Sequence, residues 1–373
     1  MKRHRVLQIV ASSRGGAAEL LRCLVKGLDP AEFESVVVMP DDGGHVLEAD
    51  FAALGVRLER FALDTGFRLH EFMRLRRFVR GGSFDVIHVH GARAALWGRL
   101  AALGPSRPRI VFGVHGLSIV HYTGLKRSFL VGVERLLGRM TDATLCDSHV
   151  ERTDVLKWKI ARPHQARVVW NGIDLERLIE PPGGKAAARA ALGLSAREAV
   201  LVTVCRLNKP RDFETLLGAM PAIIGVRPDT RLLIVGDGPL RPQVEALVGQ
   251  HRLGEHVRLL GLVRNISEVL AAADIALLIT KGWEGLPLAA LEAMAMGLPL
   301  IISDVGGNTE AVLHGETGLV IPQADVAALV RATFDLLQNP GQAREMGEAG
   351  AARVRENFDL RIMAAKTAAF YRR

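Results

Sequence analysis

The sequence predicts an α/β protein with two domains, each a doubly wound parallel sheet, and three observations support this fold class. Short apolar runs rich in β-branched residues alternate with helical stretches along all 373 residues. The runs are continuous rather than alternating, as expected for parallel strands that are buried on both faces. Twelve such runs are too many for one sheet with short connections, and a chain of this length typically forms two domains. We therefore expect two Rossmann-like domains that face each other across a cleft.

The predicted strands form two sets. In the first half of the chain they are Val6–Val10, Val36–Met39, Val86–Val89, Ile110–Val114, Ala143–Cys146 and Val168–Trp170. In the second half they are Val200–Val204, Leu232–Val235, Val257–Leu260, Ile275–Ile279, Leu300–Ile302 and Leu319–Ile321. The segments between them, such as Ala17–Leu28 and Arg241–Gln250, are rich in Ala, Leu, Arg and Glu, which predicts helices and hence βαβ units.

The boundary between the domains is predicted near Glu180–Lys185. Two prolines and two glycines in this segment can neither continue a helix nor pack as a strand. We place the first domain at 1–178 and the second at 179–356, and we expect a terminal helix over about 357–373 to pack back on the first domain. Doubly wound sheets bind ligands at the carboxyl ends of their strands, so the cleft is the expected ligand site.

Composition excludes several classes of protein. Hydrophobic residues make up 49% of the chain and charged residues 24%, which excludes disorder, collagen and coiled coil. The three cysteines share no short spacing, which excludes a disulfide framework and a structural zinc site. No apolar run reaches 18 residues, and the basic start of the chain lacks a cleavable signal. We therefore expect a soluble protein of the cytoplasm.

The net charge of +8 is unevenly distributed. Residues 1–170 hold 26 basic and 17 acidic residues, a net charge of +9, whereas residues 171–373 hold 22 and 23, a net charge of −1. A one-sided excess indicates that one face meets an anionic partner, and a merely solvated basic surface is the alternative. Nucleic acid is not the expected partner, because the two Tyr and four Trp are dispersed and no recognition module is present.

In the first half, a glycine turn follows the first predicted strand. Gly15 and Gly16 lie in the segment Ser12–Ala17, which also opens a helix. Glycines there let backbone N–H groups approach a phosphate, and a helix N-terminus favours negative charge. A glycine turn required only by sterics is the alternative, since the segment is neither a complete G-x-G-x-x-G nor a P-loop.

Three histidines lie at strand ends of the first half. His88 and His90 alternate along one strand, so they point to the same face of the sheet, and His115 ends the next strand between two glycines. That placement predicts that His115 projects into the cleft. We expect no metal, because no carboxylate or cysteine stands at ligand spacing from these histidines.

Basic residues follow the first strand of the second half. Arg206, Lys209 and Arg211 lie within six residues and would repel one another without an anion. A pyrophosphate meets that need, and arginine offers it bidentate geometry. A solvated turn is the alternative interpretation. Farther along, Gly236 and Gly238 form a tight turn after a strand, where a base or phosphate can lie close to the backbone.

The segment Gly282–Gly297 is the most informative in the chain. Glu284 follows a strand, Pro287 suits a first helical turn, and Glu292 lies in the second turn of a mostly apolar helix. A carboxylate on such a helix is costly unless it accepts hydrogen bonds, for which ligand hydroxyls are suited. A pyrophosphate can rest on the backbone amides at the helix start, which belong to Gly285, Leu286 and Leu288. A surface glutamate is the alternative for Glu292.

These residues match the pattern of a known family. Glu284 and Glu292 stand in E-G-x-P-x-x-x-L-E-A-M-A-x-G-x-P, which is followed by Ser303–Glu310. The pattern closely resembles the family 4 retaining glycosyltransferases of the GT-B fold. The likeness spans nearly the whole chain and includes the early Gly15-Gly16 loop, Asn171 within Trp170–Asp174, and Gly236–Pro239.

The resemblance implies roles for the candidate residues. Glu292 would hold the nucleotide ribose, Glu284 would face the donor sugar, and Arg206 would hold the pyrophosphate. A histidine placed like His115 would lie at the reaction centre. One departure is that the family usually has lysine at the position of Arg211, so that a planar guanidinium replaces a point charge.

The implied activity is metal-independent transfer of a sugar, with retention, from a nucleoside-diphosphate sugar to a hydroxyl of a glycan or lipid-linked glycan. No cofactor is expected. Positive charge and helix amides would stabilise the leaving diphosphate, which would itself take the acceptor proton during front-face attack. The stretch His70–Asp142 also resembles the capsule and exopolysaccharide branch of the family. An inverting GT-B enzyme, a non-hydrolysing sugar-nucleotide epimerase and a non-catalytic sugar-nucleotide-binding protein are the alternatives.

The segment Arg68–Arg80 predicts contact with an anionic membrane. It contains five arginines and one glutamate, and its apolar residues form one stripe at helical spacing. For the apolar stripe we favour packing on the first sheet. The arginines can still face an anionic leaflet from a docked helix, which predicts peripheral attachment to the inner face of the cytoplasmic membrane.

Overall fold

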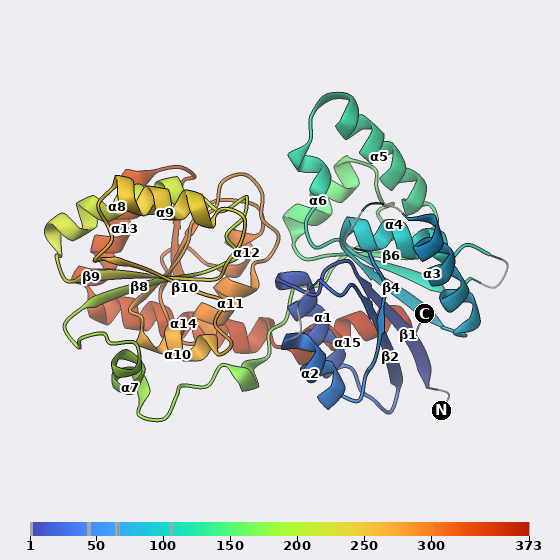
Figure 1. The fold of residues 1–373 in the computed structure, drawn as a ribbon, viewed down its shortest axis with the longest axis horizontal. Coiled ribbons are helices and arrows are strands. Elements are labelled where there is room, and N and C mark those ends of the chain that lie inside the picture. Colours follow the sequence, from blue (N-terminus) through green and yellow to red (C-terminus); the bar gives the residue numbers. More distant parts are fainter. Residues whose placement is uncertain (1–2, 43–45, 64–65, 67, 105–106, 373) are drawn as a thin grey trace. The chain divides into compact units, whose positions relative to one another are not determined.

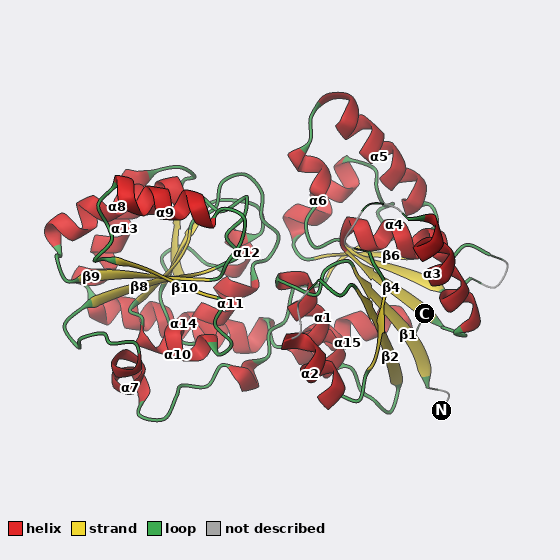
Figure 2. Ribbon diagram, in the orientation of Figure 1, coloured by secondary structure: helices red, strands yellow, loops and turns green. Residues whose placement is uncertain are grey.

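The computed structural model describes residues 3–42, 46–63, 66, 68–104 and 107–372 and divides the chain into two compact units. Unit 1 comprises the chain up to Gly172 together with the segment from Leu360, and unit 2 is Ile173–Asp359. The two points at which the chain crosses between the units are adjacent, because the Ile173 amide donates to the Phe358 carbonyl at 2.8 Å. In each unit a parallel sheet has helices on both faces (Figures 1 and 2), which confirms the predicted fold class.

Unit 1 contains a seven-stranded parallel sheet in the order β3-β2-β1-β4-β5-β6-β7. Its strands are β1 (His4–Val10), β2 (Phe33–Met39), β3 (Arg57–Arg60), β4 (Val86–His90), β5 (Arg109–Gly113), β6 (Ala143–Cys146) and β7 (Ala166–Val168). All six strands predicted for this half are present, with β7 shifted toward the N-terminus. The sequence did not predict β3, because this edge strand reads Arg-Leu-Glu-Arg and has no apolar run.

The helices of unit 1 follow the strands and cover both faces of the sheet. They are α1 (Gly16–Gly27), α2 (Val46–Ala53), α3 (Leu69–Gly81), α4 (Gly91–Ala101), α5 (Gly124–Gly138), α6 (His149–Lys157), the short 3-10 helix η1 (Ser118–His121) and the terminal α15 (Leu360–Tyr371). Helix α15 packs against α1. The pleat of β2 shows how the core divides: Val36 and Val38 join the apolar cluster that includes α3 and α4, while Val37 and Met39 join the cluster that includes α1 and α2.

Unit 2 contains a six-stranded parallel sheet in the order β10-β9-β8-β11-β12-β13. Its strands are β8 (Ala199–Val204), β9 (Thr230–Val235), β10 (Val257–Gly261), β11 (Ile275–Leu278), β12 (Leu300–Ser303) and β13 (Gly318–Ile321), all of which the sequence predicts to within a few residues. Its helices are α7 (Gly184–Ala191), α8 (Phe213–Val226), α9 (Arg241–Gln250), α10 (Ile266–Ala272), α11 (Leu288–Ala295), α12 (Asn308–Ala311), α13 (Val326–Gln338), α14 (Pro340–Asn357) and the 3-10 helix η2 (Leu175–Arg177).

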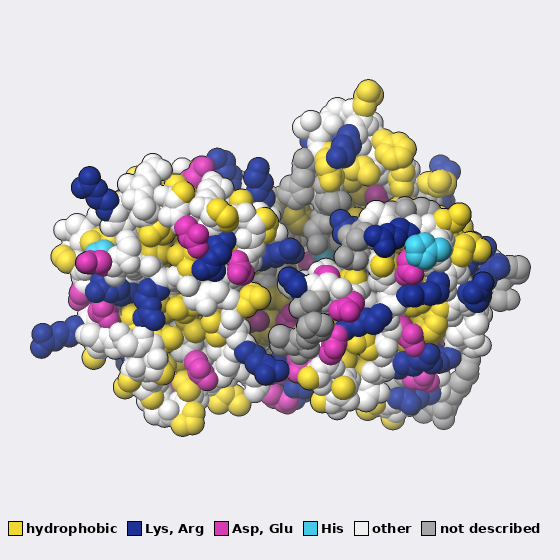
Figure 3. Space-filling view, in the orientation of Figure 1, with side chains coloured by type: hydrophobic (Ala, Val, Ile, Leu, Met, Phe, Trp, Pro, Cys, Tyr) yellow, Lys and Arg dark blue, Asp and Glu magenta, His cyan; other side chains and the backbone are white. Residues whose placement is uncertain are grey.

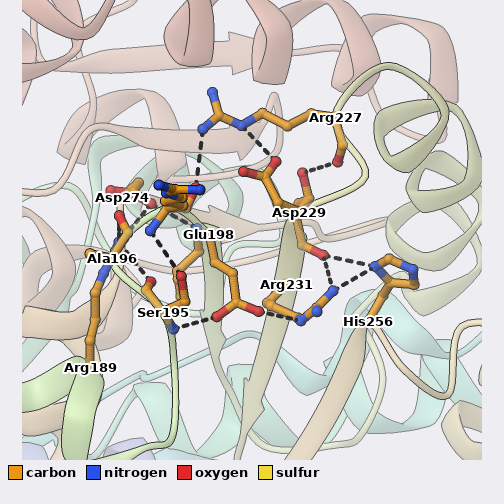
Figure 4. A network of polar contacts seen from close by, with 12 residues as sticks. Arg189, Ser195, Ala196, Glu198, Arg227, Asp229, Arg231, His256 and Asp274 are labelled. Carbon is orange, nitrogen blue, oxygen red and sulfur yellow. Dashed lines mark hydrogen bonds and ion pairs between the residues drawn. The ribbon is translucent and has the colours of Figure 1, made fainter.

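A polar network ties together the amino ends of four strands of unit 2, β8, β9, β10 and β11 (Figure 4). Asp274 precedes β11 and accepts from Arg189 at 2.7 Å, while Glu198 precedes β8 and pairs with Arg231 of β9 at 2.8 Å. Arg231 also contacts the ring of His256, 3.0 Å from its Nδ1. These side chains lie at the amino ends of the strands, where they stabilise the sheet. The network therefore does not occupy the carboxyl ends of the strands, where doubly wound folds bind ligands.

Glu134 forms a buried ion pair in unit 1. Arg99 of α4 is fully buried, donates to Glu134 of α5 at 2.7 Å and lies 4.4 Å from the centre of the Phe112 ring. Burial lowers the pKa of Arg99, and Glu134 opposes this shift. Asp142 near the end of the same segment pairs with Arg107 at 2.8 Å. Glu134 and Asp142, which belong to the stretch His70–Asp142 that resembles the capsule and exopolysaccharide branch, therefore have structural partners within unit 1.

We predict that Glu134→Gln lowers the free energy of unfolding by about 3–5 kcal/mol, because it leaves a buried guanidinium without a counter-charge. Denaturant titration measures this loss. Glu348→Gln is the matched control, since the pair of Glu348 with Arg344 is exposed and is worth less than about 1 kcal/mol. Equal losses in the two variants would contradict the prediction.

Candidate active site

The sheet of unit 2 has its topological switch point between β8 and β11. The chain leaves β8 toward β9 on one side, and β11 begins the return on the other side. Ligands of open doubly wound sheets bind outside the carboxyl ends of the strands at such a point. The loops that follow β8 and β11 contain Arg206–Arg211 and Thr280–Glu284, which are the basic segment and the first glutamate predicted from the sequence.

Arg211 connects these two loops. Its guanidinium pairs with the Glu284 carboxylate and donates to Thr280 Oγ1 at 2.7 Å, and an isolated antiparallel bridge joins Arg211 to Thr280. Both members of the ion pair are largely buried, with 14% and 17% of their side chains exposed. The structure therefore brings together two predicted site residues that are 73 positions apart in the chain.

The three cations after β8 have different surroundings. Arg206 and Lys209 are exposed, whereas Arg211 faces Glu284 of the chain itself. The anion that the sequence led us to expect beside Arg211 is thus at least partly supplied by the protein. Arg211 Nε remains buried and, in the described part of the chain, has no hydrogen-bond acceptor. Two exposed cations and one buried N–H donor consequently border the switch point.

Gly236 and Gly238 let two loops approach each other closely. A Cβ on Gly236 would lie 1.9 Å from the Cys205 carbonyl oxygen, and one on Gly238 would lie 2.4 Å from that of Leu207. The Leu207 amide donates to the Asp237 carbonyl at 3.0 Å. On the side to which a Cβ would point, the backbone of the loop after β8 therefore approaches these glycines as closely as the sequence predicts for a base or phosphate.

Gly306 gives the loop after β12 the same kind of approach to Glu284. A Cβ on Gly306 would lie 1.9 Å from the Glu284 carbonyl oxygen, and the Gly307 amide donates to that oxygen at 3.1 Å. The loops after β8, β11 and β12 are thus connected through the side chain and the carbonyl of one residue. Glu284 is a structural centre of this edge as well as a candidate site residue.

Helix α11 begins beside these loops. Pro287 is its N-cap, Gly285 and Leu286 before it are buried, and Leu288 and Glu292 within the helix are half-buried. The predicted start of the helix near Pro287 is confirmed. Glu292 lies on the second turn, as expected, so that a carboxylate and a helix N-terminus both belong to the segment that follows β11.

In unit 1, His115 follows the end of β5 with both ring nitrogens hydrogen-bonded. Its Nδ1 lies 3.0 Å from Asp147 Oδ1, and its Nε2 lies 2.9 Å from His90 Nδ1. His115 has a left-handed backbone with a φ of 47°, which is uncommon for a residue with a Cβ and typical of constrained sites. Asp147 is not among the site residues predicted from the sequence, although it directly follows the buried strand β6 and several of the other predicted residues also stand at strand ends.

Glu151 holds the turns that carry His115 and Asp147. Its carboxylate accepts from the Gly116 amide at 2.8 Å and from the Asp147 amide at 2.7 Å. Burial first, and the charge of Asp147 second, raise the pKa of Glu151 well above its usual value. A buried carboxyl that joins the turns after β5 and β6 explains how a strained backbone at His115 is maintained.

The glycine turn after β1 is hydrogen-bonded to a carboxylate of the chain, that of Asp42. The Ser13 amide donates to the Asp42 carboxylate at 3.2 Å, and Ser12 Oγ lies 2.9 Å from it. Burial alone would raise the pKa of Asp42, but hydrogen bonds from Ser13 and Ser12 hold it below its ordinary value. Gly15 is exposed with a φ of 81°, so that this turn requires glycine whether or not it binds a phosphate.

The predicted site residues fall into one group in each unit. Gly15, Gly16, His115 and Asn171 belong to unit 1, where Asn171 is buried after β7. The larger group belongs to unit 2 and comprises Arg206, Lys209, Arg211, Gly236, Gly238, Glu284, Gly285, Leu286, Leu288 and Glu292. In the residues that the structure describes, no three His, Cys, Asp or Glu side chains form a group able to hold a metal ion.

Comparison with known proteins identifies the family. Residues 14–177 match the family described as "Glycosyltransferase Family 4", and residues 198–339 match "Glycosyl transferases group 1". A GDP-mannose-dependent alpha-(1-6)-phosphatidylinositol monomannoside mannosyltransferase of Mycolicibacterium smegmatis is 33% identical over 374 residues, covering 95% of this chain and 94% of the relative. The chain belongs to glycosyltransferase family 4.

Further likenesses agree with this assignment. A UDP-Gal:alpha-D-GlcNAc-diphosphoundecaprenol alpha-1,3-galactosyltransferase of Escherichia coli is 29% identical to this glycosyltransferase, over 73% of the chain and 72% of the relative. Anabaena HepE in complex with UDP and glucose has a TM-score of 0.86 at 19% identity, covering 98% and 99% of the two chains. A sucrose-phosphate synthase from Thermosynechococcus elongatus has a TM-score of 0.82 at 24% identity, over 99% and 98%. The two structural likenesses confirm the predicted GT-B fold.

Among the helices that the structure describes, none combines the length and the apolar character needed to cross a bilayer.

We predict that Gly306→Ala destabilises the glycosyltransferase more than Gly315→Ala. Both glycines have positive φ values, 49° and 80°, so each variant carries a backbone strain of about 1–2 kcal/mol. Only Gly306 has a backbone atom in the way, the Glu284 carbonyl oxygen, whereas a Cβ on Gly315 meets nothing within 4 Å. We expect Gly306→Ala to lose about 1–3 kcal/mol more in the free energy of unfolding. Equal destabilisation in denaturant titrations would show that the loop after β12 does not depend on this approach.

Proposed function

We propose that this glycosyltransferase moves a sugar, with retention, from a nucleoside-diphosphate sugar to a hydroxyl of a glycan or lipid-linked glycan, without a metal ion. The observation that carries the proposal is the group of cations, glutamates and a helix start at the switch point of unit 2. HepE has been crystallised with UDP and glucose, and relatives in Escherichia coli and Mycolicibacterium smegmatis act on a lipid diphosphate and a phosphatidylinositol monomannoside.

The diphosphate of the donor is assigned to the exposed cations and the start of α11. Arg206 and Lys209 supply positive charge, and the amides near Gly285, Leu286 and Leu288 add the positive end of the helix dipole. Arg211 lies next to them, and its Nε offers a further donor. These groups stabilise the negative charge that develops on the leaving diphosphate, which is the work that a divalent cation does in other enzymes.

Two carboxylates are assigned to hydroxyl groups of the donor. Glu292 on α11 is suited to the nucleotide ribose, and Glu284 is suited to the sugar, with Arg211 holding its side chain in place. Hydrogen bonds to a carboxylate are stronger than those between neutral groups. Because Glu284 is already paired with Arg211, its orientation toward the sugar is fixed before the donor binds, which reduces the entropy lost on binding.

The chemical step requires no covalent intermediate. Burial raises the pKa of the Cys205 thiol beside Arg206, so this cysteine is not an activated nucleophile. The acceptor hydroxyl attacks the anomeric carbon on the face that the diphosphate leaves, the carbon–phosphate oxygen bond breaks, and the departing phosphate oxygen takes the hydroxyl proton. Asp147 and His90 hydrogen-bond to the two ring nitrogens of His115 and hold its imidazole in one orientation. In this step His115 therefore acts as an oriented ring and not as a free base.

We predict that Glu292→Ala weakens binding of the matching nucleoside diphosphate about ten- to a hundredfold, which corresponds to a charge-assisted hydrogen bond of about 1.5–3 kcal/mol. Calorimetric titration with UDP and GDP measures this. Glu345→Ala, at an exposed position of α14, is the control and should bind as tightly as the unmodified chain. With the matching sugar donor, turnover should persist in excess EDTA. Unchanged affinity of a folded Glu292→Ala, or turnover that EDTA abolishes and Mg²⁺ restores, would contradict the proposal.

We also propose that unit 1 contacts an anionic membrane, through helix α5. Three large apolar side chains on one stripe of this helix are exposed: Leu125 by 90%, Phe129 by 70% and Leu136 by 60%. The cations Lys126, Arg127, Arg135 and Arg139 flank them, of which Arg127 and Arg135 also donate to the carbonyls of Tyr122 and Trp158. Glu134, the only acidic residue of α5, is buried against Arg99. Figure 3 shows hydrophobic and basic side chains gathered over α5. Apolar side chains bordered by cations fit an interface with anionic lipid.

The sequence pointed instead to α3, which fits this role less well. Leu75 and Val79 of its apolar stripe are buried in the core of unit 1, as the favoured packing interpretation predicts, whereas Leu69 at its start is 67% exposed. Arg74 pairs with Glu71 at 3.3 Å, and its guanidinium lies 4.2 Å from the centre of the Phe61 ring. Part of the positive charge of α3 is therefore neutralised and turned toward the protein.

We predict that the chain sediments with phosphatidylglycerol vesicles but not with phosphatidylcholine vesicles, and that salt weakens this attachment. Replacing Leu125, Phe129 and Leu136 with serine should release the chain, because the exposed stripe is removed without disturbing the core. The comparison variant, with glutamine at Arg74, Arg76, Arg77 and Arg80, should lose less binding. Equal sedimentation with both lipids, or none with either, would refute the proposal.

A further inference from the structure

The hydrogen bonds of His115 continue into the core of unit 1 through four further polar side chains. His90 Nε2 lies 2.9 Å from Gln8 Oε1, and Gln8 Nε2 donates to the Tyr371 hydroxyl at 3.1 Å. The same hydroxyl lies 2.6 Å from His88 Nδ1. A relay thus runs from Asp147 through His115, His90, Gln8 and Tyr371 to His88. It joins the turns after β5 and β6 to the terminal helix α15.

The relay is buried almost completely. Gln8 is 0% exposed, and His88, His90 and Tyr371 are 2–3% exposed. Polar groups in such a place are costly unless every one is hydrogen-bonded, and apolar residues would serve packing better. Burial lowers the pKa of His88 and His90 and raises that of Tyr371, so these three side chains are neutral at physiological pH. Their arrangement therefore calls for a role besides packing.

The orientation of the Gln8 amide determines where the hydrogens of the relay lie. As found, the amide oxygen accepts from His90 Nε2–H, so neutral His90 has a bare Nδ1 that accepts from His115 Nε2–H. In a neutral His115 this leaves Nδ1, 3.0 Å from Asp147 Oδ1, without a hydrogen. With the amide turned by 180°, Gln8 donates to His90, His90 Nδ1–H donates to His115 Nε2, and His115 keeps a hydrogen on Nδ1 alone.

Tyr371 completes either arrangement. Its hydroxyl accepts from Gln8 and donates to His88 Nδ1 in the first, and it donates to Gln8 and accepts from His88 in the second. Removing the hydroxyl leaves the amide without a partner on that side. The placement of the hydrogens on His115 is thus connected to a side chain in α15, which lies 363 positions from Gln8 in the sequence.

We propose that Tyr371, Gln8 and His90 are positioning residues for His115: they determine which of its ring nitrogens carries a hydrogen and thereby set the rate of sugar transfer. This inference rests on the proposed function, in which the imidazole of His115 is oriented at the reaction centre. Donor binding is assigned to unit 2, so the relay affects turnover and leaves the affinity for the nucleoside diphosphate unchanged.

The test is Tyr371→Phe, with Tyr122→Phe as the matched control. Tyr122 is the only other tyrosine: its ring lies beneath Lys126, its carbonyl accepts from Arg127, and its amide donates to the Ile119 carbonyl. We expect Tyr371→Phe to lower kcat about three- to tenfold, the effect of one lost hydrogen bond, with unchanged nucleoside-diphosphate affinity. We expect Tyr122→Phe to change neither quantity.

Two readouts separate positioning from a general loss of structure. Imidazole ¹⁵N signals of His90 and His115, assigned with His90→Gln and His115→Gln, should show one hydrogen placement in the unmodified chain and a mixture in Tyr371→Phe. Combining Tyr371→Phe with His90→Gln should lower kcat no further than the more damaging single change. If Tyr371→Phe does not fold, Gln8→Met takes its place, since it removes the Gln8 amide from the relay and puts an apolar side chain of similar length there.

Three results would each contradict the proposal: histidine signals that do not change in Tyr371→Phe, a loss of kcat in the double variant that equals the product of the two single losses, or a weakened affinity for the nucleoside diphosphate. A chain that transfers no sugar at all would instead refute the proposed function. The ¹⁵N signals alone would then decide whether the relay determines which ring nitrogen of His115 carries the hydrogen.

Discussion

The ion pair between Arg211 and Glu284 is the interaction on which the organisation of the unit 2 edge depends. A parallel sheet brings the carboxyl ends of β8 and β11 side by side, but their loops come from distant parts of the chain. The pair joins them, and the Glu284 carbonyl then anchors the loop after β12. One nitrogen of the guanidinium, Nη1, makes both contacts and so holds the Glu284 carboxylate and Thr280 Oγ1 together.

In unit 1, other side chains hold together the loops at the carboxyl ends of the strands. Its carboxyl edge carries histidines and carboxyls that hydrogen-bond to one another, and Glu151 stabilises the strained turn at His115 through two backbone amides. The relay continues these bonds to α15, so the end of the chain supports residues near its beginning. Terminal helix and candidate site are therefore parts of one hydrogen-bonded assembly within unit 1.

The sequence predicted most of the fold because buried parallel strands leave continuous apolar runs. It failed at β3, where an edge strand is partly exposed and its charged residues conceal the strand. It also selected most polar residues at strand ends, and it correctly placed Glu292 on the second turn of α11. The sequence did not predict the partners of these residues, because the contacts of Arg211 with Glu284 and of Gln8 with Tyr371 depend on the order of strands and helices in space. For the same reason, the glycines at Gly236 and Gly238 predicted a close approach without showing that the neighbour is the chain's own backbone.

The most direct test of the central claim is the configuration of the transferred sugar at its anomeric carbon. The unmodified chain would be supplied with the nucleoside-diphosphate α-sugar whose nucleotide it binds and with a lipid-linked glycan acceptor, and the product linkage read from its one-bond carbon–proton coupling. Front-face transfer from the donor site in unit 2 predicts an α-linked product. A β-linked product would contradict it and assign the chain an inverting mechanism on the same fold.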